Sequence, residues 1–265
     1  MKDKRIAIIG CGNLGLTIVN GLLSDKTFDA SNIVVTRRNV AVLAHLAERG
    51  VKVMTDNAAA VKEADVIILG VKPYIVKPVL EEIGSSLVEG KHTLACLATG
   101  VTLNELSSWS GAQLPVFRVM PNTAADVNES MTLICNKGAS SEIQNTVTSL
   151  FDKIGSTQHI DESLMEAATV LGASGIAFVL RFMRAMIQGG VEVGFDAKTA
   201  TAIVSQTVKG AAELLIKNGT HPENEIDKVT TPKGCTITGL NEMEHAGFSA
   251  AVIKGIVASY KKLEK

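Results

Sequence analysis

The chain has few cysteines, few aromatic residues and almost no net charge. Its four cysteines, Cys11, Cys96, Cys135 and Cys235, form no C-x-x-C pair, which argues against a disulfide framework and favours a reducing cytoplasm. Aromatic residues make up only 4% of the chain, so its core must be built from aliphatic side chains. The formal net charge is -1 and no basic stripe is present, which argues against a nucleic-acid partner.

Long apolar runs and metal-binding motifs are also missing. The longest apolar run, Ala167–Leu180, is too short and too rich in Gly and Ser to span a bilayer, so we expect a buried helix and no membrane association. The five histidines are scattered and show no H-E-x-x-H spacing, so we expect no metal site. These features together predict a soluble, cytoplasmic protein.

Residues 1–160 alternate short apolar runs with amphipathic stretches, which predicts βαβ units and a parallel sheet. The predicted strands are Ile6–Ile9, Ile33–Thr36, Val51–Met54, Val66–Val71, Thr93–Leu97, Val116–Val119 and Met131–Cys135. The predicted helices between them include Leu14–Ser24, Val40–Arg49 and Ile75–Ile83. The fold class predicted for this half is therefore α/β with a mostly parallel sheet.

Residues 161–265 show helical patterns alone, over Glu162–Val193, Ala197–Asn218 and Thr238–Lys262. We therefore predict a second, all-α domain that starts near residue 161. A helical segment of this length and composition makes a thin core by itself, so we expect it to complete that core by forming a homodimer.

The first motif that indicates chemistry is the loop Gly10-Cys11-Gly12-Asn13-Leu14-Gly15. It follows a predicted strand and opens a predicted helix, which is the context that a dinucleotide-binding G-x-G-x-x-G loop requires. Gly10 permits the tight turn, Gly12 lets the backbone approach a pyrophosphate, and Gly15 lets the helix pack on the strand. The helix amino terminus then offers N–H groups and a positive dipole end to the phosphates.

The end of the second predicted strand indicates which dinucleotide binds. NAD-binding proteins usually place a carboxylate there, but this chain has Thr36-Arg37-Arg38. Two guanidinium groups and a hydroxyl suit a 2′-phosphate, which favours NADPH over NADH. The alternative is that Arg37 and Arg38 are solvated loop charges.

A second motif lies near the carboxyl end, where the hydroxyl-rich segment Thr230-Thr231-Pro232-Lys233-Gly234-Cys235-Thr236 runs into a predicted helix. The amino terminus of that helix can offer backbone N–H groups to a carboxylate. The alternative is that the threonines only cap the helix, since Thr is a good N-cap residue.

Together these segments resemble pyrroline-5-carboxylate reductase, over nearly the whole chain. The resemblance rests on the glycine loop, Val71-Lys72-Pro73, Ala98-Thr99-Gly100-Val101, Met120-Pro121-Asn122-Thr123 and the hydroxyl-rich turn. It implies a Rossmann domain, a helical dimerisation domain, and a site shared between protomers. It also implies NADPH-dependent reduction of a cyclic imine to L-proline, the last step of proline biosynthesis, and dimers that commonly assemble into decamers.

The resemblance also assigns site residues. It places Ile9, Gly10, Cys11, Gly12, Asn13 and Leu14 along the pyrophosphate, with Arg37 at the adenosine phosphate. Asn57, Gly70, Val71, Lys72, Pro73, Leu97, Ala98 and Thr99 would border the rest of the coenzyme. Glu162, Thr231, Gly234, Cys235 and Thr236 would face the substrate. Taken alone, Lys72 could be an ordinary surface lysine, and Asn57 could equally cap the helix that follows Thr55-Asp56.

Imine reduction needs a place for the charge on the ring nitrogen, and we expect Thr236 to be the catalytic residue that hydrogen-bonds it. The chain departs from the family pattern at Lys233, Ile176, Arg184 and Ala124. Two alternatives follow: a paralogue that binds NADPH without turnover, and an NADPH-dependent reductase of the 3-hydroxyacid dehydrogenase type. The second would need a lysine on an interior helix, where this chain offers Arg181 and Arg184.

Overall fold

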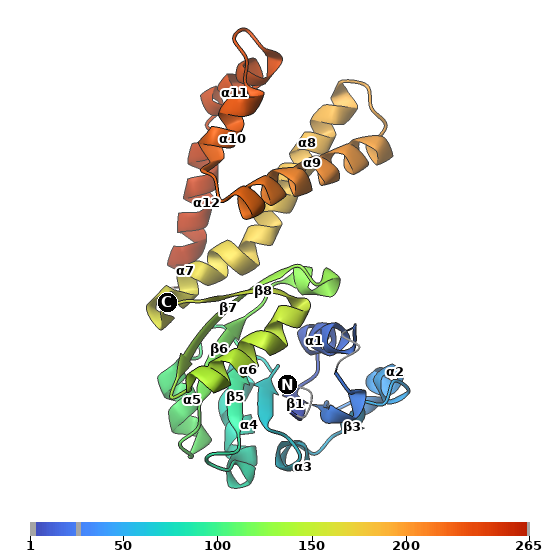
Figure 1. The fold of residues 1–265 in the computed structure, drawn as a ribbon, viewed down its shortest axis with the longest axis vertical. Coiled ribbons are helices and arrows are strands. Elements are labelled where there is room, and N and C mark those ends of the chain that lie inside the picture. Colours follow the sequence, from blue (N-terminus) through green and yellow to red (C-terminus); the bar gives the residue numbers. More distant parts are fainter. Residues whose placement is uncertain (1–3, 25–27, 264–265) are drawn as a thin grey trace. The chain divides into compact units, whose positions relative to one another are not determined.

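The computed structural model describes residues 4–24 and 28–263. Contacts divide the chain into two compact units, with the division between Ala173 and Ser174. The change in sequence pattern predicts a domain boundary near residue 160, and this division lies further along the chain. The boundary near residue 160 stays a prediction. The first unit carries all the described strands, and the second is helical (Figure 1).

The first unit is built on an eight-stranded sheet with the order β3-β2-β1-β4-β5-β6-β7-β8. The strands are β1 Ile6–Ile9, β2 Ile33–Thr36, β3 Lys52–Met54, β4 Val66–Leu69, β5 Thr93–Cys96, β6 Val116–Met120, β7 Ser130–Lys137 and β8 Gly155–His159. The one antiparallel pair among the described strands is β6–β7, and β8 is parallel to β7, so β7 and β8 run opposite to the other six strands. The mostly parallel sheet confirms the predicted fold class. The strand β8 was not predicted, because its sequence GSTQH lacks the apolar residues by which a strand is recognised.

Helices cover both faces of this sheet. They are α1 Asn13–Ser24, α2 Ala44–Ala47, α3 Asn57–Lys62, α4 Pro73–Ile83, α5 Leu103–Ser110, α6 Ser141–Phe151 and α7 Met165–Thr169. One buried cluster joins the sheet to α3, α4 and α5, and a second joins it to α1, α2 and α6. The predicted helix Val40–Arg49 is shorter than expected, because its first turn, Val40–Leu43, is a 3-10 helix capped by the side chain of Asn39.

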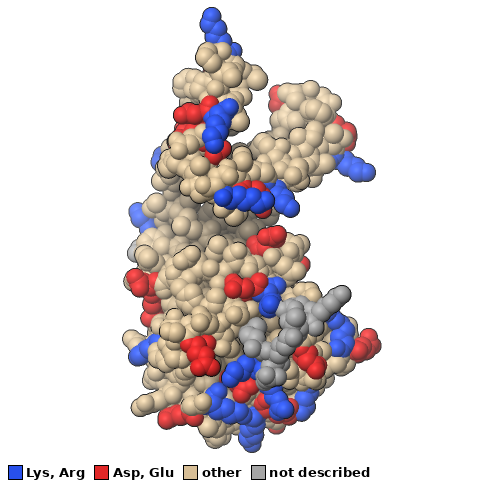
Figure 2. Space-filling model, in the orientation of Figure 1, with Lys and Arg blue, Asp and Glu red and all other residues tan. Residues whose placement is uncertain are grey.

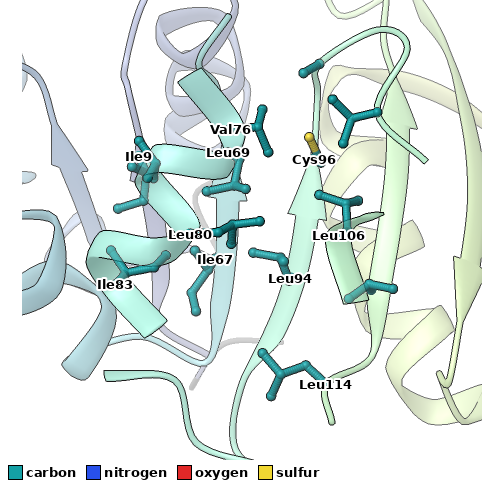
Figure 3. Close-up of a cluster of buried hydrophobic side chains, with 14 of the residues drawn as sticks. Ile9, Ile67, Leu69, Val76, Leu80, Ile83, Leu94, Cys96, Leu106 and Leu114 are labelled. Carbon is teal, nitrogen blue, oxygen red and sulfur yellow. The ribbon is translucent and has the colours of Figure 1, made fainter. Parts of the chain in front are cut away.

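Successive strand residues point to opposite faces, so strands as apolar as IAII and VIIL supply both clusters. Figure 3 shows Ile67 and Leu69 of β4 and Leu94 of β5 against Val76, Leu80 and Ile83 of α4. Full burial of one such side chain stabilises the fold by about 1.5–3 kcal/mol. This packing holds the carboxyl ends of the parallel strands at one edge of the sheet.

The second unit consists of α8 Gly175–Glu192, α9 Ala197–Asn218, α10 Pro222–Val229, α11 Cys235–His245 and α12 Phe248–Leu263. The helix predicted over Thr238–Lys262 is in fact two helices, because Gly247 adopts a φ of 82° between them. A left-handed glycine ends a helix readily. The short helix α10, which starts at Pro222, was not predicted.

The helical unit buries very little of its apolar surface within one chain. None of α8, α10, α11 and α12 contains a buried residue, and α9 buries only Ala200 and Val204. The expectation that the apolar run Ala167–Leu180 forms a buried helix holds only for part of the run: Thr169 and Val170 are buried, whereas Phe178, Val179 and Leu180 are exposed. In the space-filling view, wide tan areas separate the charged side chains of these helices, and the acidic and basic residues in view are interspersed (Figure 2).

By length and composition alone, one described helical segment, Glu162–Glu192, could cross a membrane. One such segment is weak evidence, because core helices of globular proteins pass the same test. Apolar side chains of this segment, such as Phe178 and Phe182, stay partly exposed, and the ring centre of Phe182 lies 5.9 Å from that of Phe248 in α12.

Candidate functional site

The turn after β1 requires glycine at its first position. Gly10 has a φ of 81°, a conformation that other residues rarely adopt. A Cβ added there would lie 2.3 Å from Cγ1 of Val71, and one added at Gly70 would lie 3.0 Å from the Gly10 oxygen. The loops after β1 and β4 are thus pressed together at the point where the strand order reverses. Ligands of open α/β sheets bind at such a point.

The other two glycines of the loop have different surroundings. A Cβ at Gly12 would meet nothing closer than the Gly10 oxygen at 4.0 Å, so the backbone there borders open space. A Cβ at Gly15 would lie 3.2 Å from Cγ2 of Ile8, where α1 packs on β1. The helix α1 begins at Asn13, directly after the open position. This combination of an open backbone and a helix amino terminus suits a phosphate group.

Arg37 lies against this loop. Its Nη1 donates a hydrogen bond to the Cys11 carbonyl at 3.2 Å, while the neighbouring Arg38 is exposed. Burial raises the pKa of the Cys11 thiol to about 11, against the opposing influence of the Arg37 charge. The side chains of Ile9 and Cys11 are both buried in the core, so these two residues can offer a ligand only their backbone.

Asn57 does not cap its helix. The N-cap of α3 is Asp56, whose side chain accepts from the N–H of Ala59. The Asn57 side chain instead accepts from the Thr36 hydroxyl at 2.6 Å and donates to the Glu82 carboxylate at 3.1 Å. Thr36 in turn accepts from the Gly10 N–H at 3.3 Å. Asn57 therefore belongs to a polar chain that starts at the glycine loop.

The remaining predicted coenzyme residues follow the carboxyl ends of β4 and β5. Lys72 is exposed and is the N-cap residue of α4, with no side-chain cap. Leu97 and Ala98 are buried, and the Leu97 N–H donates to the Leu69 carbonyl at 3.0 Å. Because β1, β4 and β5 are neighbours in the sheet, the structure brings Gly10–Leu14, Gly70–Pro73 and Leu97–Thr99 to one edge.

Glu162 has two partners within the first unit. Its Oε1 accepts from the Leu103 N–H at 2.7 Å and from Nη1 of Arg118 at 3.1 Å. Arg118 is only 3% exposed, and its Nη2 donates to Glu166 at 2.7 Å. Glu162 thus neutralises the buried guanidinium of Arg118 and accepts a hydrogen bond from the first N–H of α5. These contacts give it a structural role that is separate from any contact with a substrate. Sequence reasoning missed Arg118, because an arginine in an apolar strand carries no motif.

The hydroxyl-rich segment forms a tight turn before α11. The Gly234 N–H donates to the Thr231 carbonyl at 2.9 Å, with Pro232 second in the turn and Lys233 third at a φ of 61°. A type II turn has this pattern, usually with glycine third. A Cβ at Gly234 would lie 2.5 Å from the Thr231 hydroxyl, so this position needs a glycine.

No threonine caps α11, so the capping alternative is wrong. The N-cap residue is Gly234, and it makes no side-chain cap hydrogen bond. The Thr230 hydroxyl is directed back to the Asp227 carbonyl at the end of α10, at 3.2 Å. Cys235 and Thr236 open the helix, so their N–H groups and the Thr236 hydroxyl belong to an uncapped helix end.

Comparison with known proteins identifies the family of this chain. Residues 162–265 match the family model for pyrroline-5-carboxylate reductase dimerisation, and residues 5–99 match one described as NADP oxidoreductase, coenzyme F420-dependent. Pyrroline-5-carboxylate reductase 2 of Dictyostelium discoideum is 40% identical over 100% of this chain and 93% of its own length. The chain belongs to the pyrroline-5-carboxylate reductase family.

Other members of the reductase family agree. Pyrroline-5-carboxylate reductase 1 of Dictyostelium discoideum is 41% identical over 99% of this chain, which spans half of that protein's length. The structure of a pyrroline-5-carboxylate reductase from Coxiella burnetii is 29% identical, with a TM-score of 0.92 over 98% of this chain and 97% of its own. That of the Plasmodium falciparum enzyme, with NADP bound, is 25% identical, with a TM-score of 0.86 over 99% and 98%.

Proposed function

We propose that this protein is an NADPH-dependent oxidoreductase that reduces 1-pyrroline-5-carboxylate to L-proline, the last step of proline biosynthesis. The observation that carries the proposal is the reductase-family relationship over the whole chain, supported by the NADP named for a solved relative. The residues fit that coenzyme, because Gly12 borders open space beside a helix amino terminus and Arg37 lies over the same loop.

When bound, the reduced nicotinamide would supply a hydride to the C=N carbon of the substrate, and the ring nitrogen would carry the matching proton, so that the C=N bond becomes a CH–NH bond. The residues of this chain bind the coenzyme and the substrate and orient them relative to each other. The N–H groups at the start of α1 would face the pyrophosphate, and Thr36, Arg37 and Arg38 the 2′-phosphate. Gly70, Val71, Lys72, Pro73, Leu97, Ala98 and Thr99 lie after neighbouring strands and would border the ribose and nicotinamide.

On the substrate side, we assign the carboxylate to the N–H groups of the uncapped start of α11, beginning with Cys235. Gly234 stays a predicted substrate residue, although its own N–H is bonded to the Thr231 carbonyl. The Thr236 hydroxyl hydrogen-bonds the ring nitrogen during reduction, and Thr231 lies in the same turn. Support comes from the turn itself, which keeps this helix end without a side-chain cap. Glu162 stays a predicted substrate residue, and its contact with Arg118 limits how far its carboxylate can move.

The helical unit functions as a dimerisation domain. Its family model carries that description, and exposed residues such as Phe178, Phe182 and Phe248 give the helices an apolar surface for a second copy. Further assembly into a decamer and a cytoplasmic location are our proposals. The second is supported by four free cysteines that form no disulfide among the described residues.

The decisive experiment follows NADPH absorbance with purified protein, first with 1-pyrroline-5-carboxylate and then with 2-keto acids. We expect consumption with the imine alone, and proline as the product in chromatography. Consumption with 2-keto acids would support a reductase of the 3-hydroxyacid dehydrogenase type. If NADPH binds but is consumed with neither the imine nor the 2-keto acids, the result would support a non-catalytic paralogue and refute the proposal.

A further inference from the structure

A chain of hydrogen bonds runs from the glycine loop to a helix on one face of the sheet. The Gly10 N–H donates to the Thr36 hydroxyl, which donates to Oδ1 of Asn57 at 2.6 Å. The Asn57 amide nitrogen donates to both oxygens of Glu82, at 3.1 and 3.2 Å. Thr36 is 1% exposed, whereas Glu82 lies on the exposed side of α4. The chain therefore joins a buried strand end to a surface charge.

The charge on Glu82 decides the direction of the other hydrogen bonds in this series. An ionised carboxylate can only accept hydrogen bonds, so the amide nitrogen of Asn57 must face it. The amide oxygen must then face Thr36, and the Thr36 proton is committed to Asn57. The remaining lone pairs of the Thr36 hydroxyl face the Gly10 N–H. A neutral glutamine at position 82 could present either an oxygen or an amide nitrogen, so it would not enforce this order.

The same arrangement brings a carboxylate to the neighbourhood of the second strand's end. NAD-binding proteins of this fold place an acidic residue at that point, where it binds the ribose hydroxyls and disfavours a 2′-phosphate. Here the residues after Val35 are Thr36-Arg37-Arg38, with no acid. Glu82 approaches from α4 and is two hydrogen bonds away from Thr36.

We propose that Glu82 is a positioning residue that limits the preference of the coenzyme site for NADP over NAD, by fixing the Asn57 amide and placing a negative charge near the 2′-phosphate. This inference rests on the proposed function for its choice of coenzyme. It deepens that function, because Arg37 and Arg38 favour the phosphorylated coenzyme and Glu82 opposes them. The balance of these three side chains sets how well the site also accepts NAD.

The test compares Glu82→Gln with Glu81→Gln. Glu81 is the adjacent exposed residue on the same helix, and its carboxylate lies 3.9 Å from Lys77, so this control removes the same charge without touching Asn57. Dissociation constants for NADP⁺ and NAD⁺ are measured by calorimetry without imine, at low and high salt. Because no turnover is needed, the outcome is independent of whether the imine is the substrate.

We expect Glu82→Gln to raise the NADP⁺ to NAD⁺ affinity ratio by roughly 2- to 5-fold, the factor that corresponds to one exposed charge pair. The gain should shrink at ~1 M salt, where the Debye length is ~3 Å. Glu81→Gln should leave the ratio at the wild-type value. An equal weakening of both coenzymes, a salt-independent change, or the same shift in both variants would overturn the proposal. Each of these would show that Glu82 does not set the coenzyme preference through its charge and its contact with Asn57.

Discussion

Nη1 of Arg118 lies 3.1 Å from Oε1 of Glu162, two groups that are 44 residues apart in sequence. The guanidinium is buried in β6, and a second bond at 2.7 Å ties it to Glu166 at the start of α7. A buried cation without partners is very costly, so the two carboxylates are what permits an arginine at this point of the sheet. The pair also secures the segment that leads from β8 to α7.

Glu162→Gln should lower the free energy of unfolding by about 1–3 kcal/mol, because a buried charge loses part of its compensation. Urea denaturation of the wild type and the variant measures this loss. The same substitution at exposed Glu48 serves as the control and should change stability by less than about 0.5 kcal/mol. An unchanged unfolding midpoint for Glu162→Gln would show that this carboxylate serves the ligand alone.

Two glycines of one loop should respond differently to alanine. Gly10→Ala places a methyl group 2.3 Å from Val71 at a φ of 81°, so we expect a thermal midpoint lower by several degrees. Gly12→Ala meets no protein atom closer than 4.0 Å, so the fold should persist while the new methyl group obstructs the pyrophosphate. Thermal unfolding and NADP⁺ titration separate the two effects. Equal loss of stability in both variants would contradict the assigned roles.

The sheet and the coenzyme loop could be predicted because their signals are local. Strands such as IAII and VIIL are apolar throughout, and the roles of Gly10, Gly12 and Gly15 follow from their spacing. The strand β8 could not be predicted, since GSTQH pairs with β7 through its backbone while its side chains lie largely at the surface. The α11–α12 break depends on the left-handed conformation of Gly247, which an isolated glycine in a helical pattern does not reveal.

The polar contacts around the site were less accessible to sequence reasoning. Glu82 and Arg118 act on partners 25 and 44 residues away, and nothing in their own neighbourhoods marks them. The alternatives for Asn57 could be resolved only with the side chains in place, because Asp56 and Asn57 are both good N-cap residues. Long-range pairs of this kind depend on how α3, α4 and α7 pack on the sheet.

Replacing Arg37 should change coenzyme preference more than replacing Arg38. Arg37 is held over the glycine loop by its bond to the Cys11 carbonyl, whereas Arg38 is exposed. Loss of one charged hydrogen bond costs ~1.5–3 kcal/mol, so Arg37→Gln should reduce the NADPH to NADH ratio of kcat/KM by about 10- to 150-fold. Steady-state kinetics with both coenzymes measures the ratio. An unchanged ratio in Arg37→Gln and Arg38→Gln alike would show that they are solvated loop charges.

Acid should weaken the fold through His92. This residue is 1% exposed, and its Nδ1 accepts from the Val88 N–H at 2.9 Å. Burial, together with the nearby Lys91 charge, lowers the pKa of His92 from 6.5. The unfolded chain then binds a proton more readily than the folded one. The resulting stability is present above pH 6.5 and is lost as the pH falls through the lowered pKa.

His92→Gln keeps a side-chain acceptor but does not titrate, so its thermal midpoint should fall less between pH 7.5 and 5 than that of the wild type. Scanning calorimetry across this range measures the difference. His45→Gln, at an exposed position, controls for loss of a histidine and should follow the wild type. Parallel curves for all three proteins would mean that His92 does not contribute to the acid response.

Thr236→Ala should separate catalysis from folding. The hydroxyl of Thr236 caps nothing, because the N-cap of α11 is Gly234 and no side chain caps that helix. We therefore expect little change in the thermal midpoint. Loss of this hydrogen bond to the ring nitrogen should lower kcat/KM for the imine by about 10- to 1,000-fold. Thr236→Ser, which retains the hydroxyl, should recover most of this activity.

NADP⁺ affinity should stay at the wild-type value in both variants, since neither touches the glycine loop. Full turnover in Thr236→Ala would show that this hydroxyl is not the group that hydrogen-bonds the ring nitrogen.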